Sequence, residues 1–204
     1  MNITIFGATG RVGSLVMQRA LDEGHAVTAF VRDASRLKQQ PTKQVIGDVR
    51  VKEDVFQAIE GADLVVSALG TDKTTTLTEA IPSIIAAMKQ FGVKRIVTVG
   101  TAGILQSRTD SSKVRYEAGD SNRKLTFAAE EHHRVYDQLK ATSLDWTIVC
   151  PTYLPDGEAT GKYRVEKDHL PVDGKMISVG DTAQFVYDEL MNQKFNQSRV
   201  GIAY

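Results

Sequence analysis

The chain has 204 residues, and its 25 basic and 25 acidic side chains give a formal net charge of zero. This balance excludes a global attraction to nucleic acid or to an anionic membrane, and the length suits one α/β domain. A single cysteine, Cys150, excludes an internal disulfide, and no cysteine–histidine spacing predicts a zinc site. We therefore predict one domain over residues 1–204, with no metal, nucleic-acid or membrane partner. Without a leader pattern or a long apolar span, we expect it in the cytoplasm.

Strand and helix patterns alternate along the chain. Short apolar runs predict strands over residues 3–6, 26–31, 45–46, 63–69, 94–99, 145–150 and 200–203. Apolar residues at helical spacing predict helices over residues 12–23, 55–59, 77–91, 125–142 and 182–192. This alternation predicts an α/β fold of the Rossmann type, a doubly wound, mostly parallel sheet with helices on both faces. The expected strand order is 3-2-1-4-5-6, with a seventh strand at the edge.

Two longer segments interrupt this alternation. Residues 106–123 are charged and poor in apolar side chains, which in a compact domain indicates a lid, a binding loop or a disordered segment. Residues 151–180 are rich in glycine and proline, and we expect a small irregular segment on the substrate side of the sheet.

A glycine-rich turn, Gly7-Ala8-Thr9-Gly10-Arg11-Val12-Gly13, connects the first strand to the first helix. Gly7 permits a tight turn, Gly10 lets backbone amides approach a diphosphate, and Gly13 allows close packing of helix on sheet. The helix N-terminus adds free amide donors and a partial positive charge. In this position the motif predicts a dinucleotide-binding turn.

The end of the second predicted strand discriminates between the two nicotinamide dinucleotides. Arg32 ends this strand and Arg36 follows, and guanidinium groups suit a 2′-phosphate, which favours NADP(H) over NAD(H). Asp33 leaves a second interpretation open, because an acidic residue here either accepts a bond from a ribose hydroxyl or caps the next helix. After the third strand, Asp48 and Val49 either border the adenine or form a simple turn.

Several motifs together resemble one family. They are Phe6-Gly7-Ala8-Thr9-Gly10, Val31-Arg32-Asp33-Ala34-Ser35-Arg36-Leu37, Gly47-Asp48-Val49, Leu69-Gly70-Thr71, Ile85-Ala86-Ala87-Met88-Lys89, Gly92-Val93, the segment from Ser143-Leu144 to Pro151, Thr160-Gly161-x-Tyr163, and Ile177-Ser178 to Asp181. Over nearly its whole length the chain resembles the atypical short-chain dehydrogenase/reductase proteins, specifically the biliverdin-IXβ reductase and flavin reductase branch with its NmrA-like bacterial relatives.

The resemblance implies hydride transfer from NADPH to a planar acceptor such as a flavin, a quinone or a biliverdin-like tetrapyrrole. It implies two catalytic positions, Thr101 and Tyr153, where the family carries a serine and a histidine. The cofactor site then comprises Gly7, Thr9, Gly10, Arg11, Val12, Gly13, Arg32, Arg36, Asp48, Val49, Ala68, Leu69, Gly70, Thr71, Thr101, Ala102, Pro151, Thr152 and Tyr153. The same relatives leave a second function open, a non-catalytic NADP(H) sensor that acts through a protein partner. We expect a monomer or a homodimer.

Two other patterns are weighed against structural roles. Tyr136 and Lys140 match the Y-x-x-x-K spacing of classical short-chain dehydrogenases, but they lie too close to the predicted helix end, and a surface pair is favoured. Two turns earlier, the tyrosine position is Ala128, which lacks an acidic group. His132 and His133 lie on the same helix, where we favour ordinary helix-face histidines over proton donors.

Overall fold

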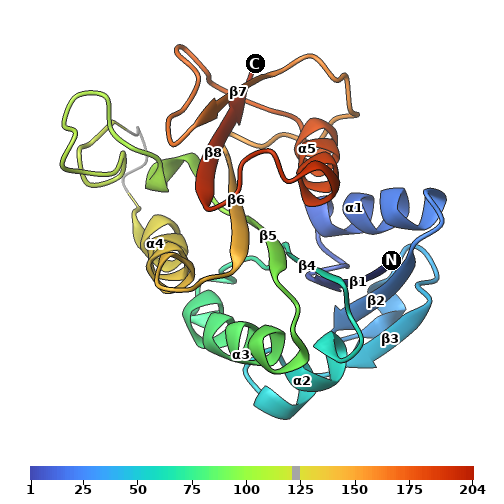
Figure 1. Ribbon diagram of the computed structural model, residues 1–204. Coiled ribbons are helices and arrows are strands. Elements are labelled where there is room, and N and C mark those ends of the chain that lie inside the picture. The colour runs from blue at the N-terminus through green and yellow to red at the C-terminus, as the bar shows by residue number, and fades with distance from the viewer. Residues whose placement is uncertain (121–124) are drawn as a thin grey trace.

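The computed structural model describes residues 1–120 and 125–204, and its centre is an eight-stranded sheet in the order β3-β2-β1-β4-β5-β6-β8-β7 (Figure 1). Seven strands run parallel and β7 pairs antiparallel with β8. Their bounds are β1 Asn2–Phe6, β2 Ala26–Val31, β3 Lys43–Ile46, β4 Leu64–Ser67, β5 Arg95–Val99, β6 Asp145–Pro151, β7 Arg164–Lys167 and β8 Ser198–Ala203. The predicted fold class and the order 3-2-1-4-5-6 are confirmed.

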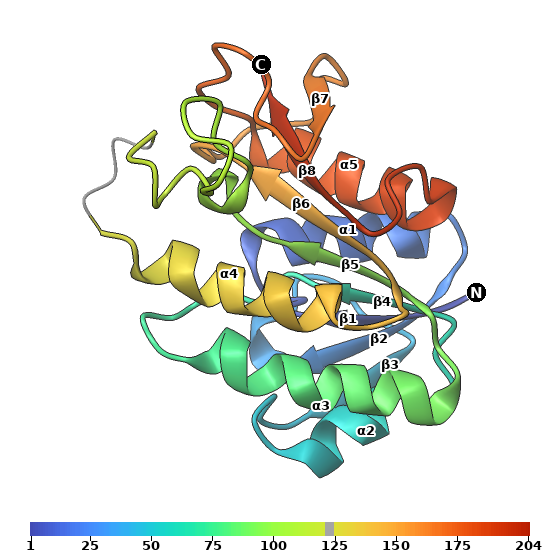
Figure 2. The same ribbon diagram turned by 60° about the vertical axis from the view of Figure 1, so that its left-hand side comes forward.

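Helices cover both faces of the sheet, as expected. Figure 2 shows α1 and α5 on one face and α2, α3 and α4 on the other. Their bounds are α1 Arg11–Asp22, α2 Lys52–Ile59, α3 Thr76–Phe91, α4 Phe127–Lys140 and α5 Val179–Asn192, with short 3-10 helices η1 Ala34–Arg36 and η2 Ala102–Ile104. Because the parallel strands all end at the same edge, the connecting loops gather there and are available to bind a ligand.

Apolar side chains alternate between the two faces of the central strands. Ile3 and Ile5 of β1 pack into the cluster under α1 and α5, whereas Phe6 packs into the cluster under α2, α3 and α4. Both faces of the central strands are therefore buried, which is why these strands are continuous apolar runs in the sequence.

The predictions for the C-terminal part need correction. The strand predicted over residues 200–203 is β8, and it lies inside the sheet between β6 and β7 instead of at its edge. The actual edge strand, β7, falls within the segment 151–180 predicted to be irregular. Its sequence, Arg-Val-Glu-Lys, is mostly charged because an edge strand faces solvent, so it carries no apolar run for a sequence pattern to detect.

Polar contacts fix the rest of this segment on the sheet. The buried Asp181 carboxylate accepts hydrogen bonds from the Thr160 amide at 2.8 Å, the Gly161 amide at 2.7 Å and the Tyr204 hydroxyl at 2.7 Å. The Tyr204 carbonyl in turn accepts a bond from Arg164 at 2.6 Å. The irregular segment is thus held between α5 and the last residue of the described chain.

The loop that follows η2 is described up to residue 120. A bridge between Gln106 and Val114 closes its first part, and the amide of Arg115 donates to the carbonyl of Leu105 at 2.9 Å. The remainder of the predicted lid, residues 121–123, lies outside the described residues. Within the described parts of the chain, no helix is long and apolar enough to cross a membrane.

Candidate functional site

The glycine-rich turn lies between β1 and α1, with Gly7 packed against the end of β4. Gly7 has a φ of 81°, and a Cβ there would lie 2.6 Å from the carbonyl carbon of Ala68. A Cβ on Gly13 would lie 2.9 Å from the carbonyl carbon of Gly7. Neither position accepts a side chain, because backbone atoms already occupy the space. The turn can therefore only form with glycine at both positions.

The first turn of α1 is open to an anion. Gly10 is the N-cap residue and provides no side-chain hydrogen bond, and the first turn contains no acidic residue. The first amide groups of a helix have no partner within the helix, so they remain available as donors. Together with the helix dipole they form a site for a negatively charged group.

A cavity of about 180 Å³ lies beside this turn, at the carboxyl ends of β1, β2 and β4. Its lining combines the glycine turn with two arginine-bearing loops. The lining residues are Gly7, Thr9, Gly10, Phe30, Val31, Arg32, Arg36, Asp48, Val49, Arg50, Ala68, Leu69, Gly70, Asp72 and Thr76. Ten residues predicted from the sequence to bind the cofactor are thus brought together: Gly7, Thr9, Gly10, Arg32, Arg36, Asp48, Val49, Ala68, Leu69 and Gly70.

Arg32 and Arg36 line one end of this cavity. Arg32 donates to the Asp72 carboxylate at 2.9 Å, but both side chains are more than half exposed, so the pair contributes little to stability. Asp33 instead accepts bonds from the amide and the hydroxyl of Ser35 at 2.9 and 2.7 Å, and these bonds lower its pKa. Of the two roles open to Asp33, the structure shows the helix cap.

Asp48 and Arg50 form a tight pair in the loop after β3, which also lines this cavity. The guanidinium of Arg50 donates to the two oxygens of Asp48, from Nε at 3.0 Å and from Nη2 at 2.6 Å. These hydrogen bonds, supported by the Arg50 amide, lower the pKa of Asp48 to about 2. The carboxylate is therefore charged at any physiological pH, and Arg50 is held in one orientation.

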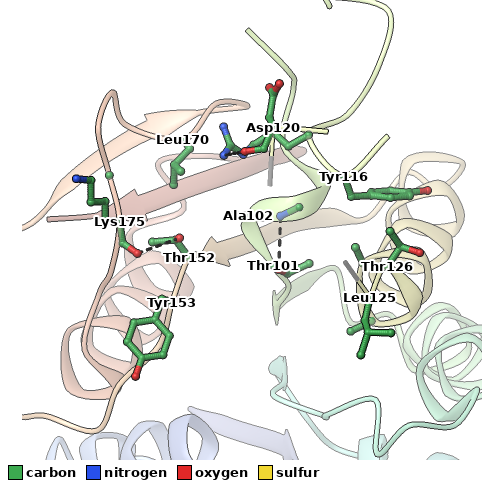
Figure 3. A pocket seen from close by; sticks show the side chains of 15 residues that line it. Thr101, Ala102, Tyr116, Asp120, Leu125, Thr126, Thr152, Tyr153, Leu170 and Lys175 are labelled. Carbon is green, nitrogen blue, oxygen red and sulfur yellow. Dashed lines mark hydrogen bonds between the residues drawn. The ribbon is translucent and has the colours of Figure 1, made fainter. Parts of the chain in front are cut away.

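A second and larger cavity, of about 440 Å³, lies at the ends of β5 and β6. It is lined by Thr101, Ala102, Gly103, Arg115, Tyr116, Asp120, Leu125, Thr126, Ala128, Ala129, Thr152, Tyr153, Leu170, Gly174 and Lys175. Figure 3 shows Thr101 between Tyr153 on one side and Thr126 on the other. Because β4 lies between β1 and β5, the two cavities occupy neighbouring positions along one edge of the sheet.

Comparison with known proteins decides the family. A family model described as NAD(P)H-binding matches residues 7–193. The chain belongs to this NAD(P)H-binding family. It is 31% identical to the uncharacterised protein YwnB of Bacillus subtilis, over 98% of this chain and 96% of that one. A solved structure from Bacteroides thetaiotaomicron, provisionally named an epimerase, is 31% identical with a TM-score of 0.85, over 100% of this chain and 96% of the other. Another from Streptococcus pneumoniae, provisionally named an NADH-flavin reductase, is 28% identical with a TM-score of 0.81, over 100% and 99%.

The predicted NAD(P)H cofactor is confirmed by membership of this NAD(P)H-binding family, and the described residues fit it. The uncapped first turn of α1 suits a diphosphate, and the missing side chain at Gly10 leaves the approach to it open. The arginines at the end of β2 suit the negative charge of a phosphorylated ribose. The residues at the carboxyl ends of the strands thus fit the cofactor of the family.

Five predicted cofactor residues are not part of the lining of either cavity. Val12 and Pro151 are buried, Gly13 packs on Gly7, and Thr71 follows the cavity-lining Gly70. The Arg11 guanidinium donates to the Leu154 carbonyl at 2.9 Å and to Asp156 at 3.1 Å, which ties the turn to the segment after β6. Their roles toward the cofactor stay predictions.

Sequence reasoning missed five residues of the first cavity: Phe30, Val31, Arg50, Asp72 and Thr76. Arg50 lies two positions after the predicted Asp48, so the Asp-x-Arg spacing was an available signal. Asp72 gave no such signal, because its pairing with Arg32 joins two loops far apart in the sequence.

The other residues considered for catalysis take part in packing contacts. Tyr136 packs edge-on against Trp146 with ring centres 5.9 Å apart, and the Arg199 guanidinium lies 4.4 Å from its ring centre. Lys140 lies over the same ring at 5.5 Å, so the Tyr136–Lys140 pair is a packing contact outside the lining of the second cavity. Cys150 is fully buried and burial raises its pKa to about 12, in keeping with a core thiol. His133 accepts or donates a bond with the Tyr116 hydroxyl at 3.0 Å.

The surroundings of His132 lead us to expect a pH-dependent stability. Although it keeps some exposed surface, the apolar packing between α3 and α4 lowers its pKa to about 4, and Glu131 offsets only part of that shift. Between about pH 6.5 and 4 the unfolded chain binds a proton that the folded chain does not. The free energy of unfolding therefore falls as the pH is lowered through this window.

We expect His132→Gln to flatten this pH dependence, with the wild type losing about 2 kcal/mol more than the variant between pH 7.5 and pH 5. Urea unfolding at both pH values measures the difference. His169→Gln is the matched control, since His169 lies in the segment after β7 and outside this helix interface. Equal losses in wild type and His132→Gln would contradict the assignment.

Proposed function

We propose that this NAD(P)H-binding protein is an NADPH-dependent reductase of the atypical short-chain dehydrogenase/reductase type that reduces a planar acceptor such as a flavin, a quinone or a biliverdin-like tetrapyrrole. The second cavity carries the proposal. Its volume of about 440 Å³ suits a multi-ring molecule, and it lies beside the cofactor cavity at the ends of β5 and β6. When bound, the nicotinamide supplies a hydride to a molecule held against it.

The preference for NADPH over NADH rests on the end of β2. Arg32 and Arg36 line the cavity there, and the exposed Asp72 that holds Arg32 is easily displaced by a more highly charged phosphate. The acidic residue that would favour NADH, Asp33, is occupied as the cap of η1. The charges at this end of the cavity thus favour the phosphorylated ribose.

In this proposal the side chains of the second cavity bind the acceptor and orient it against the nicotinamide. The Thr101 hydroxyl accepts a bond from the Gly103 amide and lies between the two walls (Figure 3), and we assign it a further bond to a carbonyl on either ring. Tyr153 is 57% exposed and offers its ring as a stacking surface. At the α4 position where a tyrosine would act as an acid, Ala128 lines the cavity. We therefore assign the proton that completes the reduction to water.

The missing acid also bears on two other functions. A sugar-nucleotide epimerase needs the tyrosine in register, so the Ala128 position argues against the function named for the Bacteroides protein. A non-catalytic NADP(H) sensor needs no acid, and Ala128 is the observation that favours it.

Purified protein mixed with NADPH and a panel of FMN, FAD, quinones and biliverdin separates the reductase from the sensor, because absorbance at the nicotinamide band falls only if an acceptor is reduced. Tight NADPH binding without oxidation by any acceptor would support the sensor.

Replacement of the Thr101 hydroxyl tests its proposed role in catalysis. We expect Thr101→Val to lower kcat with the best acceptor of that panel by about tenfold, because one hydrogen bond to the reacting rings is lost. Thr126→Val is the matched control: its hydroxyl lines the same cavity but donates to Glu130 at 2.6 Å. A Thr101→Val enzyme as active as the control would show that the hydroxyl has no part in catalysis.

A further inference from the structure

The second cavity has an uneven charge distribution. Of its described lining residues, three carry charge: Arg115, Asp120 and Lys175. The surroundings of these three side chains differ, and they decide which charge a bound molecule meets.

The negative charge of Asp120 is turned away from the cavity. Its carboxylate accepts bonds from the Ser107 hydroxyl at 2.8 Å and the Thr109 hydroxyl at 2.7 Å, which belong to the same loop. Figure 3 shows this carboxylate directed away from Thr101. Asp120 presents its backbone side to the cavity, so it adds little repulsion toward an anion there.

Burial lowers the pKa of Arg115 and the Asp120 carboxylate raises it in part, but within the described parts of the chain the Arg115 guanidinium forms no close ion pair. Its guanidinium donates one bond, from Nη2 to the Asp120 carbonyl at 3.0 Å, and among the described residues no carboxylate lies within 4.0 Å of it. Other arginines around the site do have such partners, as Arg32 does in Asp72 and Arg108 in Glu166. Arg115 is only partly exposed. A half-buried guanidinium at a cavity wall that donates one bond to the described residues suits a carboxylate or a phosphate.

The other cation at the cavity is placed differently. Lys175 is exposed, and Figure 3 shows its ammonium pointing away from Thr152 and from the centre of the cavity. The rim also exposes apolar surface, with Leu125 87% and Tyr153 57% accessible. The rim therefore suits an apolar ring system, and Arg115, in the loop after η2, suits an anion.

We propose that Arg115 is the specificity-determining residue of this cavity and that the natural acceptor is amphipathic, a planar ring system that carries a phosphate or a carboxylate bound by the Arg115 guanidinium. This inference rests on the proposed function for the identity of the ring as acceptor. The anion subsite itself depends only on the contacts of Arg115, so binding measurements test it apart from turnover.

The test uses pairs of ligands that differ only in the anion. FMN and riboflavin share one ring and differ in a phosphate, and biliverdin and its dimethyl ester differ in two carboxylates. Each is titrated into the full-length protein with saturating NADP⁺, which blocks the arginines of the cofactor cavity, and flavin fluorescence or tetrapyrrole absorbance reports binding. We expect the anionic member of at least one pair to bind about tenfold more tightly than its neutral partner, and the pair that shows this identifies the anion as phosphate or carboxylate.

Variants connect that preference to one residue. Arg115→Gln removes the tenfold difference while neutral ligands bind as before, and Arg115→Lys restores part of it through its remaining charge. Lys113→Gln is the matched control, because it removes one positive charge from the same loop at an exposed residue paired with Asp110. A preference that survives in Arg115→Gln, or equal affinities within both pairs for the wild type, would overturn the inference. Selective binding of the anionic ligand without NADPH oxidation would overturn the reductase proposal and leave the anion subsite standing.

Discussion

Replacing Arg32 and Arg36 together with glutamine should lower the preference for NADPH over NADH by about a hundredfold, measured as the ratio of the two dissociation constants. Each guanidinium contributes a charge-assisted hydrogen bond of about 1.5 kcal/mol to a 2′-phosphate, and two such bonds correspond to about two powers of ten. NADH lacks the phosphate, so its affinity should change little. The loss is then specific to one coenzyme, which distinguishes it from unfolding.

Arg50 provides the matched control for this experiment. It lines the same cavity, but its guanidinium is held by both oxygens of Asp48. We expect Arg50→Gln to leave the ratio of the dissociation constants within about threefold of the wild type, about 0.6 kcal/mol. If Arg50→Gln lowered this ratio a hundredfold and the Arg32/Arg36 double variant left it unchanged, the 2′-phosphate would have to bind at the end of β3 and not at the end of β2.

Gly7→Ala should destabilise the protein by about 3 kcal/mol and abolish saturable NADPH binding. The left-handed backbone at a φ of 81° costs a residue with a Cβ about 1–2 kcal/mol, and the overlap with the Ala68 carbonyl adds about 1–3 kcal/mol. Relief of that overlap requires β4 and the turn to separate, which would also displace the amides that face the diphosphate. Urea unfolding gives the stability, and tryptophan or nicotinamide fluorescence gives the binding.

Gly24→Ala separates the backbone contribution from the overlap with neighbouring atoms. Gly24 follows α1 with a nearly identical φ of 78°, but no heavy atom lies within 4 Å of a Cβ built there. We expect this variant to lose only the backbone contribution, about 1 kcal/mol, and to bind NADPH normally. Equal destabilisation in both variants would show that the packing of Gly7 on β4 is unimportant.

The central fold was predictable because each part of it leaves a local signal. Buried parallel strands are apolar runs, their helices show apolar residues at helical spacing, and Gly7, Gly10 and Gly13 mark the turn between them. The same reasoning failed for β7 because an exposed edge strand needs charge on its side chains, and a charged four-residue run resembles a loop. It also placed β8 at the edge, since nothing local to residues 200–203 indicates that another strand pairs outside them.

The candidate site was predictable where its residues directly follow a strand in the sequence. The turn, Arg32 and the ends of β4, β5 and β6 follow directly from strand positions. The missed contacts join distant loops, as Asp72 does with Arg32 across 40 positions and Arg11 does with Asp156 across 145. The role of Asp33 was open in the sequence because both a cap and a ribose acceptor require the same carboxylate, and only the bonds to Ser35 distinguish them.

Calorimetric titration of the purified protein with NADPH, and with NADH in parallel, tests the central claim most directly. Amide groups at the start of α1 and the arginines at the end of β2 should together give saturable binding of one NADPH per chain, tighter than that of NADH. The absence of any saturable heat with either coenzyme, from protein that circular dichroism shows to be folded, would contradict the assignment of the glycine turn as a dinucleotide site.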